Sequence, residues 1–288
     1  MIKNNIIKLK KPIDKKKIHF SFEFFPPKDK KDDFQLNNTA FQLSQLKPNF
    51  FSVTHGANNG ETNRTYDVVK TLQTNTKIIT AAHLTCINYS KNTLKKIARK
   101  YWKNGITRIV ALRGDIPNNN IKPNVYALNL VKLLKKIANF DISVAAYPEV
   151  HPEAINAQED LIYLKKKMEA GANRAITQFF FDTNKYLKFR DKCEKIGIKK
   201  EIIPGILPVS NSIQLYKFSQ LTNVHIPKFI HNLFQNQKNP ETGKITGAIL
   251  ATDMINKLKK EGVQKFHFYT LNKSDIIYNI CKIIKYYE

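Results

Sequence analysis

A single carboxylate stands in the middle of an aromatic stretch near the start of the chain. The stretch HFSFEFFPPK covers residues 19–28, and Glu23 is its only acidic residue. Because side chains alternate along a strand, Phe20, Phe22 and Phe24 should point to one face and pack under helices. Glu23 should then point to the opposite face, into the interior of whatever sheet the strand joins.

A buried glutamate at this position has two chemical interpretations. Burial in apolar surroundings disfavours the charged form, so the pKa of Glu23 should be raised, and the side chain becomes a candidate general acid near neutral pH. Alternatively, Glu23 pairs with a nearby cation such as Arg113 and serves to hold strands together. The residues alone leave both interpretations open.

Other polar and ionisable residues recur at the ends of β-rich segments. Each of them alone has an ordinary explanation, since Asp115 could belong to a turn and Asn211 could cap a helix. Together they predict a polar site where the strands end. They are Thr54, His55, His83, Thr85, Arg113, Asp115, Tyr147, Glu149, His151, Gln178, Asp182, Asn211 and Asn272.

Other site chemistries find weaker support in the sequence. His83, Glu149 and His151 could bind a metal, but they lack HxH or HExxH spacing, so no metal site is predicted. A GxSxG elbow and a Walker loop are absent, and GANNGE does not fit a GxGxxG motif after a strand.

The elements that must position these residues alternate regularly along the chain. Short β-branched and aromatic segments are separated by longer, lysine-rich segments with apolar residues every three or four positions. One such segment, SKNTLKKIARKYWKNG, has Ser90 as N-cap and Gly105 just past its end. The predicted strands cover residues 18–25, 50–55, 77–86, 107–114, 142–148, 174–181, 201–209 and 265–271.

Eight such units in a chain of 288 residues predict an α/β fold, a (βα)8 TIM barrel. The catalytic domain should be a single barrel over residues 1–288, with a frayed N-terminus over 1–17. The connection 211–262 is long enough for extra helices between strand 7 and strand 8. Within it, NQKNPETGK at 236–244 is the expected exposed loop.

Composition narrows the class of protein. Hydrophobic residues make up 42% of the chain, but no apolar run reaches the roughly 18 residues of a membrane span. The N-terminus lacks the features of a secretory signal, which predicts a cytoplasmic protein. Cys86, Cys193 and Cys281 have no CxxC pairing and are expected to be reduced thiols.

The net charge of +25 could indicate a nucleic-acid or anionic-surface partner. However, the excess is lysine spread over every predicted helix rather than gathered with aromatic residues on one element. Such a distribution is what compositional drift would leave on a tolerant surface. No nucleic-acid partner is therefore predicted.

The motifs taken in order resemble those of the bacterial methylenetetrahydrofolate reductases. They are FSFEFFPPK, SVTHGAN, HLTCI, IVALRGD, ISVAAYPEVHPEA, GANRAITQFFFD, EIIPGILPVSN and FHFYTLN. The resemblance implies a barrel that binds FAD, takes hydride from NADH and reduces 5,10-methylenetetrahydrofolate to 5-methyltetrahydrofolate for methionine synthesis. It also implies a ping-pong scheme and a homotetramer.

The same resemblance implies roles for individual residues. Glu23 would protonate N10 of the folate, and Asp115 would lie beside flavin and pterin, tuning the flavin. Gln178 and Phe218 would contact the folate, and Lys273 its carboxylate tail. The implied flavin-binding residues are Thr54, Ala57, His83, Arg113, Gly114, Asp115, Tyr126, Tyr147, His151, Ala154, Asp160 and Lys167.

Three positions depart from the usual pattern of the family. His55 replaces a tyrosine, Ala82 replaces a proline, and Lys273 replaces an arginine, which exchanges a bidentate fork for a point charge. Two other functions are alternatives to reduction of folate. One is a basic barrel that binds RNA or an anionic surface, and the other is a different barrel chemistry such as folate-dependent methyl transfer.

Overall fold

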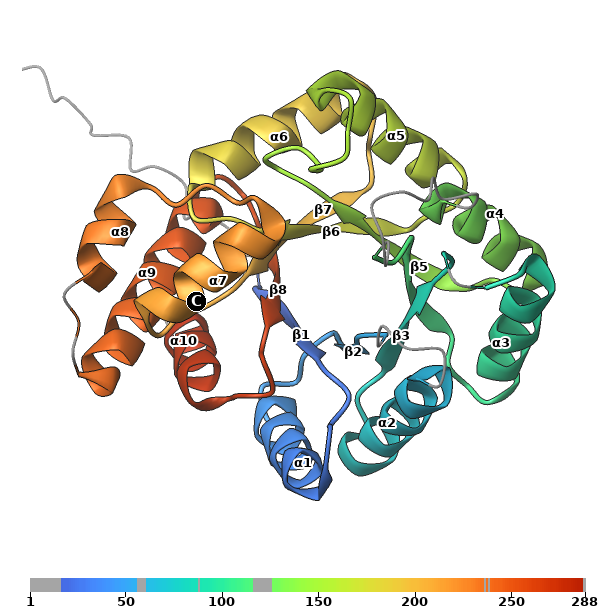
Figure 1. Cartoon of the computed structure of the whole chain (residues 1–288), viewed down its shortest axis with the longest axis horizontal. Helices are drawn as coiled ribbons and strands as arrows, with labels where there is room; N and C mark the ends of the chain where they lie inside the picture. The colour runs from blue at the N-terminus through green and yellow to red at the C-terminus, as the bar shows by residue number, and fades with distance from the viewer. Residues whose placement is uncertain are drawn as a thin grey trace, which may run out of the picture.

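The structure, a computed structural model, describes residues 17–55, 61–87, 89–115, 126–235, 237 and 239–286. Its eight strands are parallel, pair in chain order and close into a barrel through β1 and β8, with the helices outside (Figure 1). The predicted (βα)8 fold is confirmed. Of the expected frayed segment, residues 1–16 lie outside the described residues.

The strands are β1 (His19–Phe24), β2 (Phe50–Val53), β3 (Thr80–Thr85), β4 (Arg108–Leu112), β5 (Asp141–Ala146), β6 (Arg174–Phe179), β7 (Glu201–Ile206) and β8 (Lys265–Tyr269). The helices are α1 (Lys30–Ser44), α2 (Glu61–Thr76), α3 (Lys91–Lys103), α4 (Ala127–Ile137), α5 (Ala157–Glu169), α6 (Thr183–Lys195), α7 (Ser212–Thr222), α8 (Lys228–Gln235), α9 (Pro240–Lys260) and α10 (Asp275–Tyr286). None of the helices so described is both long and apolar enough to cross a membrane.

Strand β1 shows the alternation that its sequence predicts. Phe20, Phe22 and Phe24 are at most 1% exposed and lie in the core between the barrel and its helices. Phe24 meets Phe51 edge-on at 5.1 Å, and Phe20 meets Phe268 at 5.8 Å between ring centroids. Burying each of these rings contributes roughly 1.5–3 kcal/mol to the free energy of folding. Because a shift of one residue would expose them, this burial fixes the register of β1 and turns Glu23 inward.

Several helices begin at a polar residue whose side chain accepts a backbone N–H of the first turn. These N-caps are Asp29, Ser90, Asn156, Asp182, Asn211 and Asn239. Ser90 was predicted as a cap, and Gly105 follows the same helix with a φ of +77°. Two of these N-caps, Asp182 and Asn211, are among the polar residues predicted at strand ends. Their side chains cap helices.

The long connection between β7 and β8 forms α7, α8 and α9, of which α9 packs against α6 and α10. Figure 1 shows α8 at the outer edge of the molecule, beyond α9. The expected exposed loop at 236–244 is wrong from Pro240 onward, because α9 begins there with Asn239 as N-cap. Asn236 and Lys238 lie outside the described residues.

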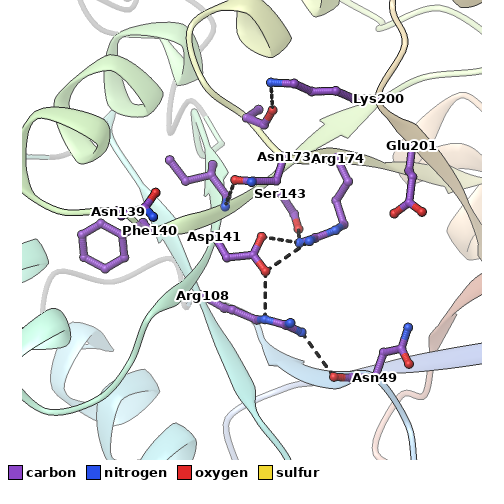
Figure 2. A network of polar contacts seen from close by, with 12 residues as sticks. Asn49, Arg108, Asn139, Phe140, Asp141, Ser143, Asn173, Arg174, Lys200 and Glu201 are labelled. Atoms are coloured by element: carbon purple, nitrogen blue, oxygen red, sulfur yellow. Dashed lines mark hydrogen bonds and ion pairs between the residues drawn. The ribbon is translucent and has the colours of Figure 1, made fainter.

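A polar network lies at the N-terminal ends of the strands (Figure 2). Asp141 is held by two arginines, with Arg108 Nε at 2.9 Å and Arg174 Nη1 at 2.6 Å. Arg108 also donates to the Asn49 carbonyl at 3.2 Å. Both guanidiniums lie near the ring of Phe50, at 5.4 and 6.0 Å from its centroid. These contacts tie β4, β5 and β6 to the start of β2 at the end opposite the predicted site.

Candidate active site

Glu23 lies inside the barrel between two histidines from other strands. Its carboxyl Oε2 is 3.3 Å from His83 Nε2 on β3 and 3.4 Å from His267 Nε2 on β8. The side chain of Glu23 is 12% exposed, and both imidazoles are buried. His267 is itself fixed by Ser21, whose hydroxyl lies 2.8 Å from Nδ1. We call Ser21, Glu23, His83 and His267 the Glu23 cluster.

The electrostatics of this cluster correct the predicted pKa of Glu23. Burial alone would raise it, as expected from the sequence. The electrostatic influence of the nearby His83 imidazole and the hydrogen bond with His267 outweigh burial and lower the pKa from 4.5 to about 2. Glu23 is therefore a carboxylate at neutral pH in this structure, in place of the expected neutral acid.

Arg113, the cation suggested as a partner for Glu23, has a different partner. At the end of β4 its Nη1 and Nη2 donate to the two carboxyl oxygens of Glu153, at 2.5 and 2.7 Å. Its Nε donates to the Gly114 carbonyl at 3.1 Å. Arg113 is therefore not the partner of Glu23, whose neighbours are the two histidines.

The loop after β5 brings further charged groups to the same end of the barrel. The ring of His151 lies edge-on to Tyr147, with 4.5 Å between the ring centroids. The backbone N–H of His151 donates to the carboxylate of Asp160 at 3.0 Å. Burial lowers the pKa of His151, and the positive charge of Arg113 lowers it further. His151 Nδ1 accepts from the Glu153 N–H at 3.0 Å, so the proton of the neutral ring lies on Nε2.

Lys167 on α5 reaches under this loop and is only 7% exposed. Its ammonium donates to the Ala145 carbonyl at 2.7 Å. Burial lowers the pKa of Lys167 from 10.5 to about 8, against the opposing effect of Asp160. We call Arg113, His151 and Lys167 the basic cluster. Of the part of the chain described here, no three His, Cys, Asp or Glu side chains are grouped as metal ligands.

The other residues implied for flavin binding lie around the mouth formed by these strand ends. Thr54 is half-buried after β2, and Asp115 is exposed after β4. Gly114 has a φ of +93°, and a Cβ there would lie 2.9 Å from Ile87, so this turn requires glycine. Tyr126 and Ala154 lie at the edge of the same region, whereas Ala57 lies outside the described residues.

The residues implied for folate binding come from the opposite side of the barrel. Gln178 is half-buried near the end of β6, and Lys273 is exposed after β8. Phe218 on α7 is half-buried and meets Phe179 edge-on at 6.2 Å. Tyr269 packs on Phe179 as well. We call Phe179, Phe218 and Tyr269 the apolar wall, and it lies beside Glu23 because Tyr269 is paired with Glu23 between β8 and β1.

Two of the departures from the family pattern have clear surroundings. His55 Nε2 lies 3.1 Å from the hydroxyl of Tyr89, so this histidine is integrated into the loop beside β2. Ala82 is fully buried on the helix-facing side of β3 and does not reach the mouth.

Sequence reasoning missed His267 and Glu153. The alternation that turned Glu23 inward also turns His267 inward in KFHFY, so the signal was present in the sequence. Glu153 carried no comparable signal, since it lies in a loop and its pairing with Arg113 depends on the fold.

Comparison with known proteins shows to which family the chain belongs. The model of the family described as methylenetetrahydrofolate reductase matches residues 8–285. This chain belongs to that family. A 5,10-methylenetetrahydrofolate reductase of Buchnera aphidicola subsp. Schizaphis graminum is 56% identical over 278 residues, covering 96% of this chain and 95% of the relative. That of Escherichia coli K12 is 55% identical over 265 residues, covering 92% and 90%.

As a member of the methylenetetrahydrofolate reductase family, the protein is an oxidoreductase, and the family supports reduction of methylenetetrahydrofolate. Solved structures support the fold alone. A protein of Clostridium thermocellum that binds two copies of 5-methyl-5,6,7,8-tetrahydrofolic acid superposes with a TM-score of 0.70 at 14% identity, covering 95% of this chain and 97% of that one. Dihydropteroate synthase from Thermus thermophilus gives 0.52 at 9% identity, covering 93% and 94%.

Proposed function

We propose that this reductase binds FAD at the mouth of the barrel, takes electrons from NADH and reduces 5,10-methylenetetrahydrofolate to 5-methyltetrahydrofolate in a ping-pong reaction. The observation that carries the proposal is the Glu23 cluster, a buried acid between two histidines beside an apolar wall and a basic cluster. The proposal includes a cytoplasmic location, a role in supplying methionine synthesis, and assembly of the chain as a homotetramer.

The basic cluster fits the diphosphate of a flavin nucleotide. Arg113 offers a planar fork suited to phosphate oxygens, and His151 offers an Nε2–H whose position is set by the bond to Glu153. Lys167 adds a nearly buried ammonium on α5. When bound, FAD would accept a hydride from NADH and pass it to the folate. Asp115, at the same mouth, would oppose build-up of negative charge beside it.

Glu23 would deliver the proton that opens the five-membered ring of the folate at N10. Because the pKa of Glu23 is about 2, the carboxylate must first receive that proton from a neighbour. His83 and His267 are the groups within reach, at 3.3 and 3.4 Å. Glu23 would thus pass on a proton relayed through one of these two imidazoles, and Ser21 keeps the ring of His267 in position for it.

The folate itself would lie between Glu23 and the apolar wall. Gln178 can donate and accept hydrogen bonds to the pterin, and Phe218 can cover its ring. Lys273, exposed beyond β8, would contact the carboxylate tail as a point charge.

The proposal is tested by following the two half-reactions separately in Glu23→Gln. Glutamine keeps the size of the side chain but cannot carry a proton to N10. Reduction of bound flavin by NADH should stay within about threefold of wild type, while its reoxidation by methylenetetrahydrofolate should fall at least about 100-fold. The measurement is anaerobic stopped-flow absorbance of the flavin.

The matched control is Glu201→Gln, the same substitution at the opposite end of the barrel, where Glu201 pairs with Lys265. Both half-reactions should survive it. Folate-dependent reoxidation at the wild-type rate in Glu23→Gln would refute the role of Glu23 as proton donor.

A further inference from the structure

The loop between β5 and α5 is held in an uncommon conformation that fixes the direction of Glu153. Val150 has a φ of +73°, which a β-branched residue adopts only when its surroundings impose it. Two hydrogen bonds of 3.0 Å flank this residue. The backbone N–H of His151 donates to Asp160, and the backbone N–H of Glu153 donates to His151 Nδ1. The backbone at Glu153 is therefore anchored, and its side chain extends toward β4.

There the carboxylate of Glu153 engages both terminal nitrogens of Arg113. With Nε already donating to the Gly114 carbonyl, each of the three guanidinium nitrogens has a protein acceptor. The side chain of Arg113 is 18% exposed and that of Glu153 is 51% exposed. The hydrogen bond from Arg113 lowers the pKa of Glu153, so the pair is ionised at neutral pH.

We infer that Glu153 is an internal competitor for the diphosphate group at Arg113 and thereby sets the affinity for the flavin nucleotide. The two oxygens of a carboxylate fit the arginine fork in the same bidentate manner as two oxygens of a phosphate. A diphosphate and a carboxylate on one guanidinium repel each other, so one of them must yield. This inference rests on the proposed function.

The geometry indicates which partner yields. Arg113 is held at Nε by the Gly114 carbonyl and is mostly buried, whereas half of the Glu153 side chain already faces solvent. Rotation of this carboxylate into water restores its hydration, which offsets most of the energy of the lost ion pair. If Glu153 merely oriented Arg113 for the cofactor, removing its carboxylate would weaken FAD binding instead of tightening it.

The test is Glu153→Gln in flavin-free protein titrated with FAD, followed by quenching of flavin fluorescence. Removing the competing charge should tighten FAD binding by about three- to tenfold. Riboflavin, which has no diphosphate, should bind wild type and variant equally. Glu159→Gln removes the same charge from an exposed position on α5 and should leave both affinities unchanged.

Equal or weaker FAD binding by Glu153→Gln would overturn the inference, as would an equal gain for riboflavin. Thermal denaturation of the flavin-free variant verifies its fold, and Glu153→Ala provides a second variant in which the competing carboxylate is absent. Wild-type protein that binds no FAD would refute the proposed function as well. Wild-type binding without a gain in either variant would refute this inference alone.

Discussion

Lys167 shows at the scale of one residue how a binding site can oppose stability. Its ammonium is nearly buried, and burial lowers the pKa from 10.5 to about 8. A folded-state pKa below the unfolded value means that folding disfavours the charged amine at neutral pH. The charge of Lys167 is therefore held at a cost that Asp160 offsets only in part and that an anionic ligand would reduce further.

Lys167→Met should consequently stabilise the flavin-free protein while weakening its binding of FAD. The gain at pH 7 should be about 1–3 kcal/mol, reduced by loss of the bond to Ala145. Between pH 8 and 10.5 the unfolded chain keeps a proton that folded wild type has lost, so the advantage of the variant should shrink as pH rises.

Urea denaturation over this pH range measures the difference between the two proteins. Lys165→Met is the control, because Lys165 is 40% exposed on the same helix. A variant that is less stable than wild type, or a difference that does not change with pH, would contradict this account of Lys167.

The Glu23 cluster shows how much of a site one sequence can predict. Alternation along β1 correctly indicated that Glu23 points into the barrel, because a strand places every second side chain on one face. The direction of its pKa shift was not predictable in the same way. It depends first on His83, on another strand, and then on His267, which is 244 positions away in the chain and reaches Glu23 only after the barrel closes.

At the scale of elements, local patterns located the strands but not all of their ends. The third strand was expected from residue 77 but begins at Thr80. Lys77 has a φ of +59° and donates its N–H to the Gln73 carbonyl, so it finishes α2 instead. The start of α9 had a recognisable signal in Asn239 followed by Pro240, which is typical of an N-cap and first helical position.

The helices α8 and α9 carry apolar side chains that face solvent. Phe229 and Leu233 on α8 are 56% and 45% exposed, and Ile245 and Ile249 on α9 are 61% and 63% exposed. Although the chain has 48 lysines and arginines, none occurs between positions 245 and 256. The exposed apolar side chains of this part of α9, Ile245 and Ile249, are suited to contact with another copy of the chain, as the proposed homotetramer requires.

Ile249→Asp should therefore lower the mass of the assembly measured by light scattering after size exclusion. A buried unpaired charge at a subunit contact costs several kcal/mol, enough to dissociate it at micromolar concentration. Asn256→Asp introduces the same charge at an exposed position farther along α9 and should leave the mass unchanged. An unchanged mass for Ile249→Asp, or a monomeric wild type, would contradict this assignment of the surface.

At the scale of the whole molecule, the two ends of the barrel are chemically distinct. Arg108, Asp141 and Arg174 tie the strands at the N-terminal end, while the Glu23 cluster and the basic cluster face the C-terminal end. The net charge of +25 is largely lysine on the helices outside this arrangement. We therefore place the proposed reductase chemistry and its ligand binding at the C-terminal end of the barrel.

The most direct test of this reductase activity is the anaerobic visible absorption spectrum of the purified wild-type protein. It is recorded first with FAD, then after NADH, and again after 5,10-methylenetetrahydrofolate. We expect a flavin band that bleaches with NADH and returns when the folate is added. A protein that takes up no flavin, or a band that bleaches and does not return with the folate, would contradict the account.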